Sequence, residues 1–100
     1  MAVQNGWVRL QPSVGLNVSF AVQTPWSYTL IPIEPEEDGY IYEVWHIDDR
    51  VDTLFHVLNR NSEARRIEHK WTHSDGSPGQ DTFSDVPPNG LLILPASAYI

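Results

Sequence analysis

The sequence predicts a single all-β domain over residues 1–100, an antiparallel β-sandwich or jelly-roll-like domain of about seven or eight short strands. Short apolar segments alternate with turn residues along the whole chain. Eight prolines are scattered through it, and before residue 36 they leave no stretch long enough for a typical helix. With 41% apolar residues, a chain of this length can bury a core of its own.

The first three predicted strands lie at 3–10, 14–22 and 26–33. The middle one is the clearest, because its even-numbered side chains are apolar and its odd-numbered ones small or polar, as in a strand with one buried face. The apolar set is Val14, Leu16, Val18, Phe20 and Val22. In the third strand Trp26 and Leu30 share a face with Tyr28, and we expect Trp26 to be buried there.

The next predicted elements are an acidic turn at 34–39, a strand at 40–47 and a strand at 90–95. The strand at 40–47 is rich in aromatic and β-branched residues, which suit a pleated surface. The run "GLLILP" at 90–95 is apolar throughout, as expected for a strand buried on both sides.

Two middle segments, 49–60 and 62–73, fit both a helix and a strand. In the first, Val51, Leu54, Phe55 and Leu58 have helical spacing, but "TLFHVL" at 53–58 also suits a central strand that is apolar on both faces. In the second, Glu, Ala and Arg favour a helix. We favour strands because the rest of the chain is β and neighbouring elements need partners in the same layers.

A strong turn cluster at 74–80, "SDGSPGQ", supports the strand interpretation of the second segment. It separates 65–73 from 81–86 and predicts a hairpin with a long tip. On that strand Ile67, His69, Trp71 and His73 face the same way.

His69 and His73 would share a helix face, but on a strand they lie about 13 Å apart and cannot bind one metal ion together. We therefore expect either core histidines with hydrogen-bond partners or polar contacts at a subunit seam. The acidic groups at 34–39 and around Asp48, Asp49 and Asp52 do not match a calcium loop. The sequence predicts no cofactor and no metal.

No motif for nucleophilic catalysis or phosphate binding is present, and there is no cysteine. Adjacent acids such as Glu36 and Glu37 point to opposite faces of a strand and form no catalytic pair by themselves. We therefore expect a protein without enzymatic activity.

The net charge of −7 is uneven. Residues 1–49 hold one base against seven acids, whereas residues 50–73 hold five bases, Arg65 and Arg66 among them, against three acids. A small basic stripe on an acidic body does not favour nucleic acid as a partner. It suits charge complementarity with another protein or between copies of the chain.

Four tryptophans and four tyrosines are a rich aromatic content for 100 residues. Tyr40 and Tyr42 flank Ile41 in a strand with no cleanly polar face, and Trp7 has polar neighbours. Such residues suit a sheet whose outer side is covered by a sugar ring or a partner subunit. The predicted interaction residues are Trp7, Tyr40, Tyr42, His69, His73, Arg65 and Arg66.

The stretch "VLNRNSEARRIEHKWTHSDGSPGQDTFSDVP" at 57–87 resembles the hairpin region of the sensory rhodopsin transducer family of small β-sandwich proteins. The shared pattern comprises Leu58-Asn59, Glu63, Ile67-Glu68, Ser74-Asp75, Pro78 and Val86-Pro87. The resemblance implies a β-sandwich and a homo-oligomer. The Ser-His-Glu stretch that the family carries before the Leu-Asn strand is replaced here by "VDT" at 51–53.

Together these observations predict a protein interaction or assembly module, a homo-oligomeric subunit of a virion decoration or tail-type structure, or a soluble signalling partner. Two alternatives stay open: a carbohydrate-binding module that uses exposed Trp and Tyr, and a metal-dependent barrel enzyme with histidines from different strands. The first ten residues lack a signal-peptide pattern and no apolar run is long enough to cross a membrane, so we expect a cytoplasmic or virion-associated protein.

Overall fold

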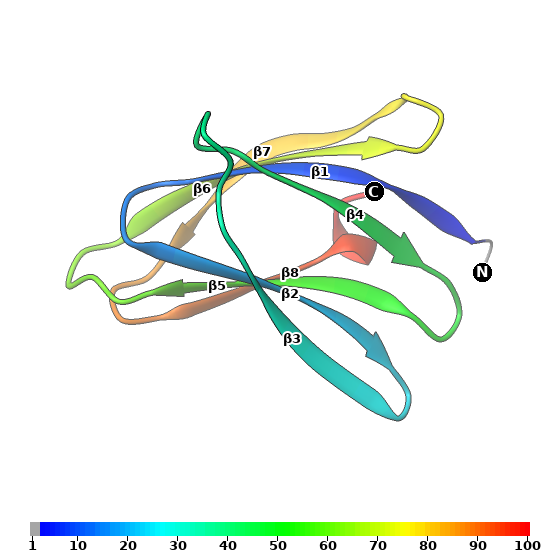
Figure 1. Ribbon diagram of the computed structural model, residues 1–100, viewed down its shortest axis with the longest axis horizontal. Helices are drawn as coiled ribbons and strands as arrows, with labels where there is room; N and C mark the ends of the chain where they lie inside the picture. The colour runs from blue at the N-terminus through cyan, green and yellow to red at the C-terminus, as the bar shows by residue number, and fades with distance from the viewer. Residues whose placement is uncertain (1–2) are drawn as a thin grey trace.

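A computed structural model of the chain, which describes residues 3–100, shows eight strands and one short 3₁₀ helix (Figure 1). The predicted all-β class and the predicted number of strands are confirmed. No described helix is long and apolar enough to span a membrane. The elements are β1 (Gln4–Pro12), β2 (Leu16–Thr24), β3 (Ser27–Ile33), β4 (Ile41–Ile47), β5 (Asp52–Asn59), β6 (Arg65–His73), β7 (Pro78–Val86), β8 (Leu91–Pro95) and η1 (Ala96–Ala98).

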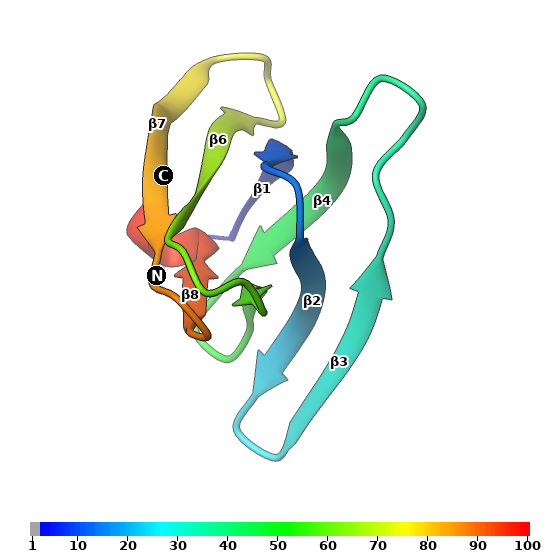
Figure 2. The ribbon, with the colours of Figure 1, turned by 90° about the vertical axis from the view of Figure 1, so that its left-hand side faces the viewer.

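The strands form two four-stranded antiparallel sheets that pack face to face (Figure 2). Sheet A has the order β4-β1-β6-β7, and sheet B has the order β3-β2-β5-β8. The chain crosses from one sheet to the other between β1 and β2, β3 and β4, β4 and β5, β5 and β6, and β7 and β8. Each of these pairs except β4 and β5 stands at matching positions in the two sheets of the β-sandwich (Figure 2).

The core lies between the sheets and is built from the alternate side chains of each strand. Trp45, Trp71 and Phe55 are its largest fully buried side chains. The rings of Phe55 and Trp71 meet edge to face across the sandwich, with centroids 5.8 Å apart. Burial of each such ring contributes on the order of 2–3 kcal/mol of transfer free energy, so these aromatics dominate the stability of the sandwich.

Both segments that fit either a helix or a strand are strands, as predicted. β5 pairs with β2 on one side and β8 on the other, and β6 pairs with β1 and β7. Ladder bonds on both edges outweigh the helix propensity of the second segment. Ile67, His69 and Trp71 face the core together, as the alternation predicts.

The predicted hairpin of β6 and β7 is present, with a tip shorter than predicted. Only residues 74–77 lie between the strands, because Pro78 and Gly79 already belong to β7. Gly76 supplies a positive φ of 87° in the turn. The carboxylate of Asp75 accepts hydrogen bonds from the backbone N–H and the hydroxyl of Ser77, which hold the turn and lower the pKa of Asp75.

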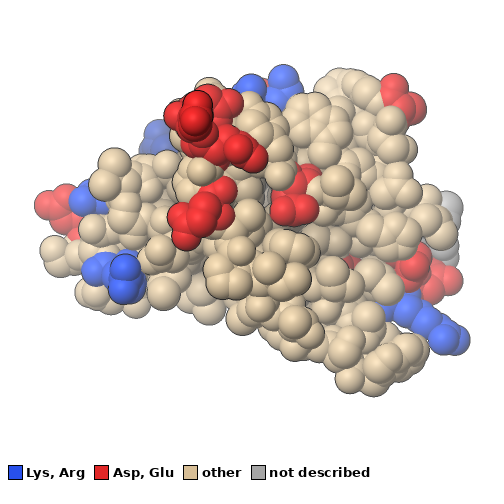
Figure 3. Space-filling model, viewed as in Figure 1, with Lys and Arg blue, Asp and Glu red and all other residues tan. Residues whose placement is uncertain are grey.

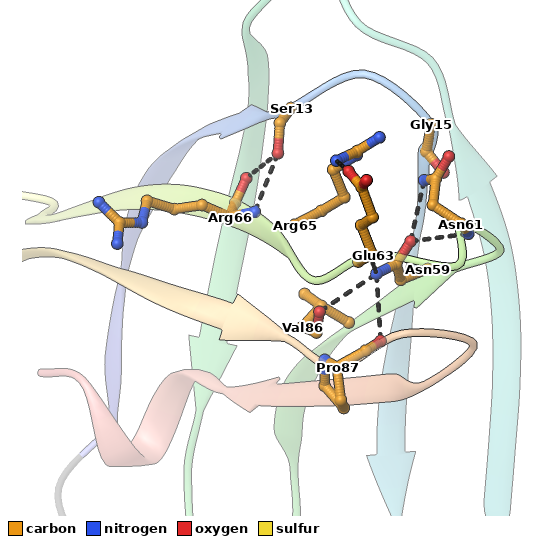
Figure 4. Close-up of polar contacts among 9 residues, drawn as sticks. All are labelled: Ser13, Gly15, Asn59, Asn61, Glu63, Arg65, Arg66, Val86 and Pro87. Atoms are coloured by element: carbon orange, nitrogen blue, oxygen red, sulfur yellow. Dashed lines mark hydrogen bonds and ion pairs between the residues drawn. The ribbon is translucent and has the colours of Figure 1, made fainter.

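Asn59, at the end of β5, fastens three connections to one another at one end of the sandwich (Figure 4). Its side chain is fully buried, and its Oδ1 accepts bonds from the backbone N–H and Nδ2 of Asn61, both 2.9 Å. Asn61 in turn donates to the carbonyl oxygen of Gly15. The Nδ2 of Asn59 lies within hydrogen-bond distance of three carbonyl oxygens, those of Glu63 (2.9 Å), Val86 (3.1 Å) and Pro87 (3.1 Å).

Two expectations about the first hairpin are wrong. Trp26 is 75% exposed instead of buried, and Val14 lies in the turn before β2, outside the strand. Trp26 is in the two-residue turn between β2 and β3, and the face it was predicted to share with Leu30 is the outer face of sheet B. Nothing in residues 3–100 covers that face.

Candidate interaction surface

The outer face of sheet B is largely apolar in β3, β5 and β8, and β2 contributes small or polar side chains to it. In β2 and β5 the alternation sends Val18, Phe55 and Val57 into the core, so the opposite set of side chains points outward. Leu30 at one edge is 50% exposed and Ile93 at the other edge is 45% exposed. We call this surface the B face; it comprises Asn17, Ser19, Ala21, Tyr28, Leu30, Pro32, Leu54, His56, Leu58, Leu91, Ile93 and Pro95.

The middle of the B face is tightly packed and uncharged. Ala21 and Leu54 are buried by their neighbours. The hydroxyl of Tyr28 is hydrogen-bonded to Nε2 of His56, and the two rings meet edge to face with centroids 5.6 Å apart. Burial lowers the pKa of His56, which favours the neutral imidazole. An apolar surface with neutral polar groups is what a partner can cover at low desolvation cost.

The only charged side chain among the outward residues of these four described strands is Asp52, at the start of β5. Its carboxylate accepts hydrogen bonds from the hydroxyl (2.5 Å) and the backbone N–H (3.3 Å) of Ser97. This pairing turns the carboxylate toward the C-terminal segment, so the B face itself stays uncharged.

The hairpin of β2 and β3 projects past the end of sheet A and adds to the uncharged surface (Figure 1). No charged residue occurs between Arg9 and Glu34. Val22 and Ile31 belong to the inward-facing set, yet both are exposed. Figure 3 shows this hairpin as an area without charge, below a group of acidic residues on the same side of the molecule.

The predicted aromatic residues Trp7, Tyr40 and Tyr42 lie together on the outer face of sheet A. Ring centroids are 6.5 Å apart for Trp7 and Tyr42 and 6.1 Å apart for Tyr42 and Tyr40. The guanidinium of Arg9 lies over the ring of Tyr40, 4.7 Å from its centroid. The hydroxyl of Tyr42 donates to Asp38, and this bond raises the pKa of Tyr42.

A shallow depression of about 390 Å³ borders Trp7 on this face. Its exposed lining is mostly apolar. Its lining is Asn5, Gly6, Trp7, Val44, His46 and Ser74.

His69 is only 1% exposed, so its predicted place among the interaction residues is wrong. Its Nδ1 accepts a bond from the indole N–H of Trp71 (2.9 Å), and its Nε2 is 3.0 Å from the hydroxyl of Ser84. The ring of Tyr99 packs against it at 4.9 Å. Of the two alternatives for this histidine, a core residue with internal partners or a polar seam contact, the structure supports the first.

The other histidines lie apart from His69 and from one another. His73 is half-buried, with its ring edge to face against Trp45 at 6.0 Å. His46 is 3.1 Å from a carboxylate oxygen of Asp48, whose pKa is lowered by the backbone N–H of Arg50 and by His46. Within residues 3–100, no three His, Cys, Asp or Glu side chains are grouped so that they could hold a metal ion.

Arg65 and Arg66 do not form a joint basic patch. Arg65 pairs with Glu63 (3.1 Å) on one side of β6. Arg66 pairs with Asp85 (3.3 Å) and lies over the ring of Phe83 on the outer face of sheet A. Exposed pairs of this kind contribute little free energy, but they neutralise the basic stripe that the sequence suggests.

The exposed leucines and isoleucine of the B face were not among the predicted interaction residues. The signal for them was present: "TLFHVL" and "GLLILP" both have the pattern of strands covered on two sides. The fold covers only one side of each. Comparison with protein-family models, with curated proteins and with solved structures finds no match. The resemblance of residues 57–87 to the sensory rhodopsin transducer family therefore stays a prediction.

Proposed function

We propose that this protein is a non-catalytic assembly module, a subunit that associates with copies of itself through the B face. One observation carries the proposal: β5 and β8 have the sequence of strands buried on both faces, but Leu58, Leu91 and Ile93 on their outer side are exposed to solvent in the single chain. An outer sheet face normally alternates to polar residues, and a large exposed apolar patch marks an interaction site.

A second copy is the partner that the surface favours. The B face has no charged row that would select a basic or acidic partner, and an isologous contact places identical apolar patches against each other. Homo-oligomer interfaces are more apolar than other protein interfaces. The larger complexes that the sequence suggests, a virion decoration or tail-type structure or a soluble signalling complex, stay predictions.

Light scattering on a size-exclusion column tests this function directly. The monomer mass is 11.4 kDa, and we expect the wild-type chain to elute at a multiple of it. Ile93→Lys places a charge in the B face and should shift the mass toward the monomer. The control Val44→Lys changes a side chain that is 67% exposed on sheet A and should leave the oligomer intact. A wild-type chain that stays monomeric over the whole accessible concentration range would refute the proposal.

Carbohydrate binding is the second candidate, and the row of Trp7, Tyr42 and Tyr40 favours it. Exposed aromatic faces with polar groups beside them are suited to stacking of a sugar ring. Tryptophan fluorescence titrated with a glycan panel tests it. Trp7→Phe should abolish the response, whereas Trp26→Phe, which replaces the other exposed tryptophan, should retain it. No response to any glycan by the wild-type chain would exclude this candidate.

A further inference from the structure

The two sheets have four edge strands, and three of them are protected against pairing with another chain. β4 is protected by the charge of Glu43, which is among its inward-facing side chains. β7 is protected by the charges of Asp81 and Asp85. β8 is only five residues long. β3 has seven residues, no charge, and side chains exposed on both faces. Its one protective feature is Pro32 near its end.

Pro32 also determines which backbone groups of β3 point outward. Proline has no N–H, and within a sheet it occupies positions whose N–H would face away from the neighbouring strand. Pro32 stands opposite Ser19 of β2. Since strand residues alternate in the direction of their backbone groups, Tyr28 and Leu30 also direct their N–H and C=O groups to the free edge. The free edge of β3 thus offers two N–H donors and three carbonyl acceptors.

Charge determines which kind of chain can approach this edge. Two copies with a net charge of −7 repel each other over most of their surface. The hairpin of β2 and β3 lies in the uncharged stretch between Arg9 and Glu34, so two copies can meet there without bringing like charges together. A two-fold axis across an antiparallel strand pair also satisfies the symmetry of a homodimer.

We propose that two copies join by antiparallel pairing of β3 with β3, about a two-fold axis beside Leu30, and so form one continuous eight-stranded sheet. The inference rests on the proposed self-association and adds an edge contact to it: a pair of copies presents its two B faces side by side, and these stack on the B faces of another pair. With Leu30 opposite Leu30, these two residues exchange two hydrogen bonds, and each Tyr28 N–H meets the carbonyl of the other copy's Pro32. The pairing buries Ile31 and Leu30 and joins the two B faces into one apolar surface.

Single-cysteine crosslinking tests the geometry, because the natural chain has no cysteine. Leu30→Cys, treated with a short bis-maleimide, should give a covalent dimer, and the control Val44→Cys on β4 should not. An Ile93→Cys variant probes the opposite edge of the same sheet. If the wild type is oligomeric but only position 93 crosslinks, β3 pairing is wrong and the proposed function stands. If the wild type is monomeric, both are wrong.

Leu30→Pro provides a second test that removes one outward N–H. We expect this variant to fold, judged by circular dichroism, and its dimer Kd to rise on the order of 100-fold, since two inter-chain bonds are lost in the dimer. Leu30→Ala, which retains the N–H, should still dimerise. If Leu30→Pro dimerises like the wild type, the proposal is wrong. If it unfolds, the Leu30 N–H bonds to β2, and the proposal is equally wrong.

Discussion

The indole N–H of Trp71 donates to Nδ1 of His69 across 2.9 Å inside the core. With that nitrogen occupied as an acceptor, the ring proton sits on Nε2, which is 3.0 Å from the hydroxyl of Ser84. This neutral tautomer satisfies both ring nitrogens. A second ring proton, on Nδ1, would find no acceptor, because it would have to displace the indole N–H of Trp71.

The first prediction concerns acid. Burial lowers the pKa of His69, and the charge of Asp81 opposes this only in part. The folded chain therefore binds a proton less readily than the unfolded chain, whose imidazole titrates at about 6.5. The stabilising contribution of neutral His69 should be constant above that pH. The free energy of unfolding should decline as the pH falls below it. Urea denaturation at about pH 7.5 and about pH 5.5 measures the decline.

His69→Gln should make the stability less sensitive to acid in this range, although it lowers stability overall. The control His73→Gln retains the buried imidazole of His69, so its free energy of unfolding should depend on pH as in the wild type. A decline that is the same in His69→Gln and in the wild type would show that the effect arises elsewhere.

The second prediction concerns Asn59. Asn59→Ala removes the buried amide that meets the carbonyl oxygens of Val86 and Pro87 and the N–H of Asn61. Unpaired buried groups cost roughly 1–3 kcal/mol each, so we expect a loss of about 3 kcal/mol in the free energy of unfolding. Ser62→Ala, in the same connection but exposed, should change it by less than about 0.5 kcal/mol. Equal effects of the two changes would contradict the assigned role.

The third prediction concerns Gly6 in β1. A Cβ atom at this position would lie 2.7 Å from the Cζ2 ring atom of Trp45 and closer still to the carbonyl oxygen of Thr72. Because both neighbours belong to the packed interior or its ladder, Gly6→Ala should cost roughly 2–3 kcal/mol by overpacking. The adjacent, exposed Asn5→Ala is the control. Thermal unfolding followed by tryptophan fluorescence measures both, and an unchanged Tm for Gly6→Ala would refute the close approach.

Alternation along the chain predicts the strands and the pairs of faces well. It placed Ile67, His69 and Trp71 on one buried face and β5 in the centre of a sheet. It could not say which face of a strand is covered, because the cover comes from residues far away in the sequence. Trp26 and Leu30 share a pattern typical of burial, yet Trp26 lies in a turn and Leu30 on the outer face of sheet B, which sheet A does not cover.

The interaction surface was harder to predict for the same reason. Residue type alone favours aromatics and arginines as interaction residues, and the apolar runs of β5 and β8 favour a place in the interior for their leucines. The sequence "TLFHVL" does require cover on both sides, but only the fold reveals that the chain itself supplies one of them. The polar fastening by Asn59 has no local pattern at all, since the partners of Asn59 and of Asn61 bonded to it come from three separate connections.

The fourth prediction concerns salt. Association through an uncharged surface is opposed by the net charge of −7, and salt screens that repulsion. Raising NaCl from about 0.05 M to about 0.5 M should therefore lower the dimer Kd several-fold, measured by sedimentation equilibrium. Salt would weaken an association held by complementary charges. A rise in Kd would therefore count against contact through the B face and in favour of contact through Arg65 and Arg66.

The fifth prediction concerns His56, the histidine of the B face. Its Nε2 is hydrogen-bonded to the hydroxyl of Tyr28, and burial lowers its pKa. A second copy would remove more water from the ring, so protonation should oppose association. The oligomer should be stable at neutral pH and dissociate as the pH falls through the lowered pKa of His56 in the single copy.

His56→Gln separates this effect from the acid sensitivity of His69, because glutamine can still bond to Tyr28 but does not titrate. Light scattering at about pH 7.5 and about pH 5.5 should show that the wild type loses mass at the lower pH and that His56→Gln does not. Circular dichroism on the same samples establishes that the chain is still folded. If the variant dissociates in acid as the wild type does, the charge that breaks the contact is not on His56, and the B face is not the surface that holds the copies together.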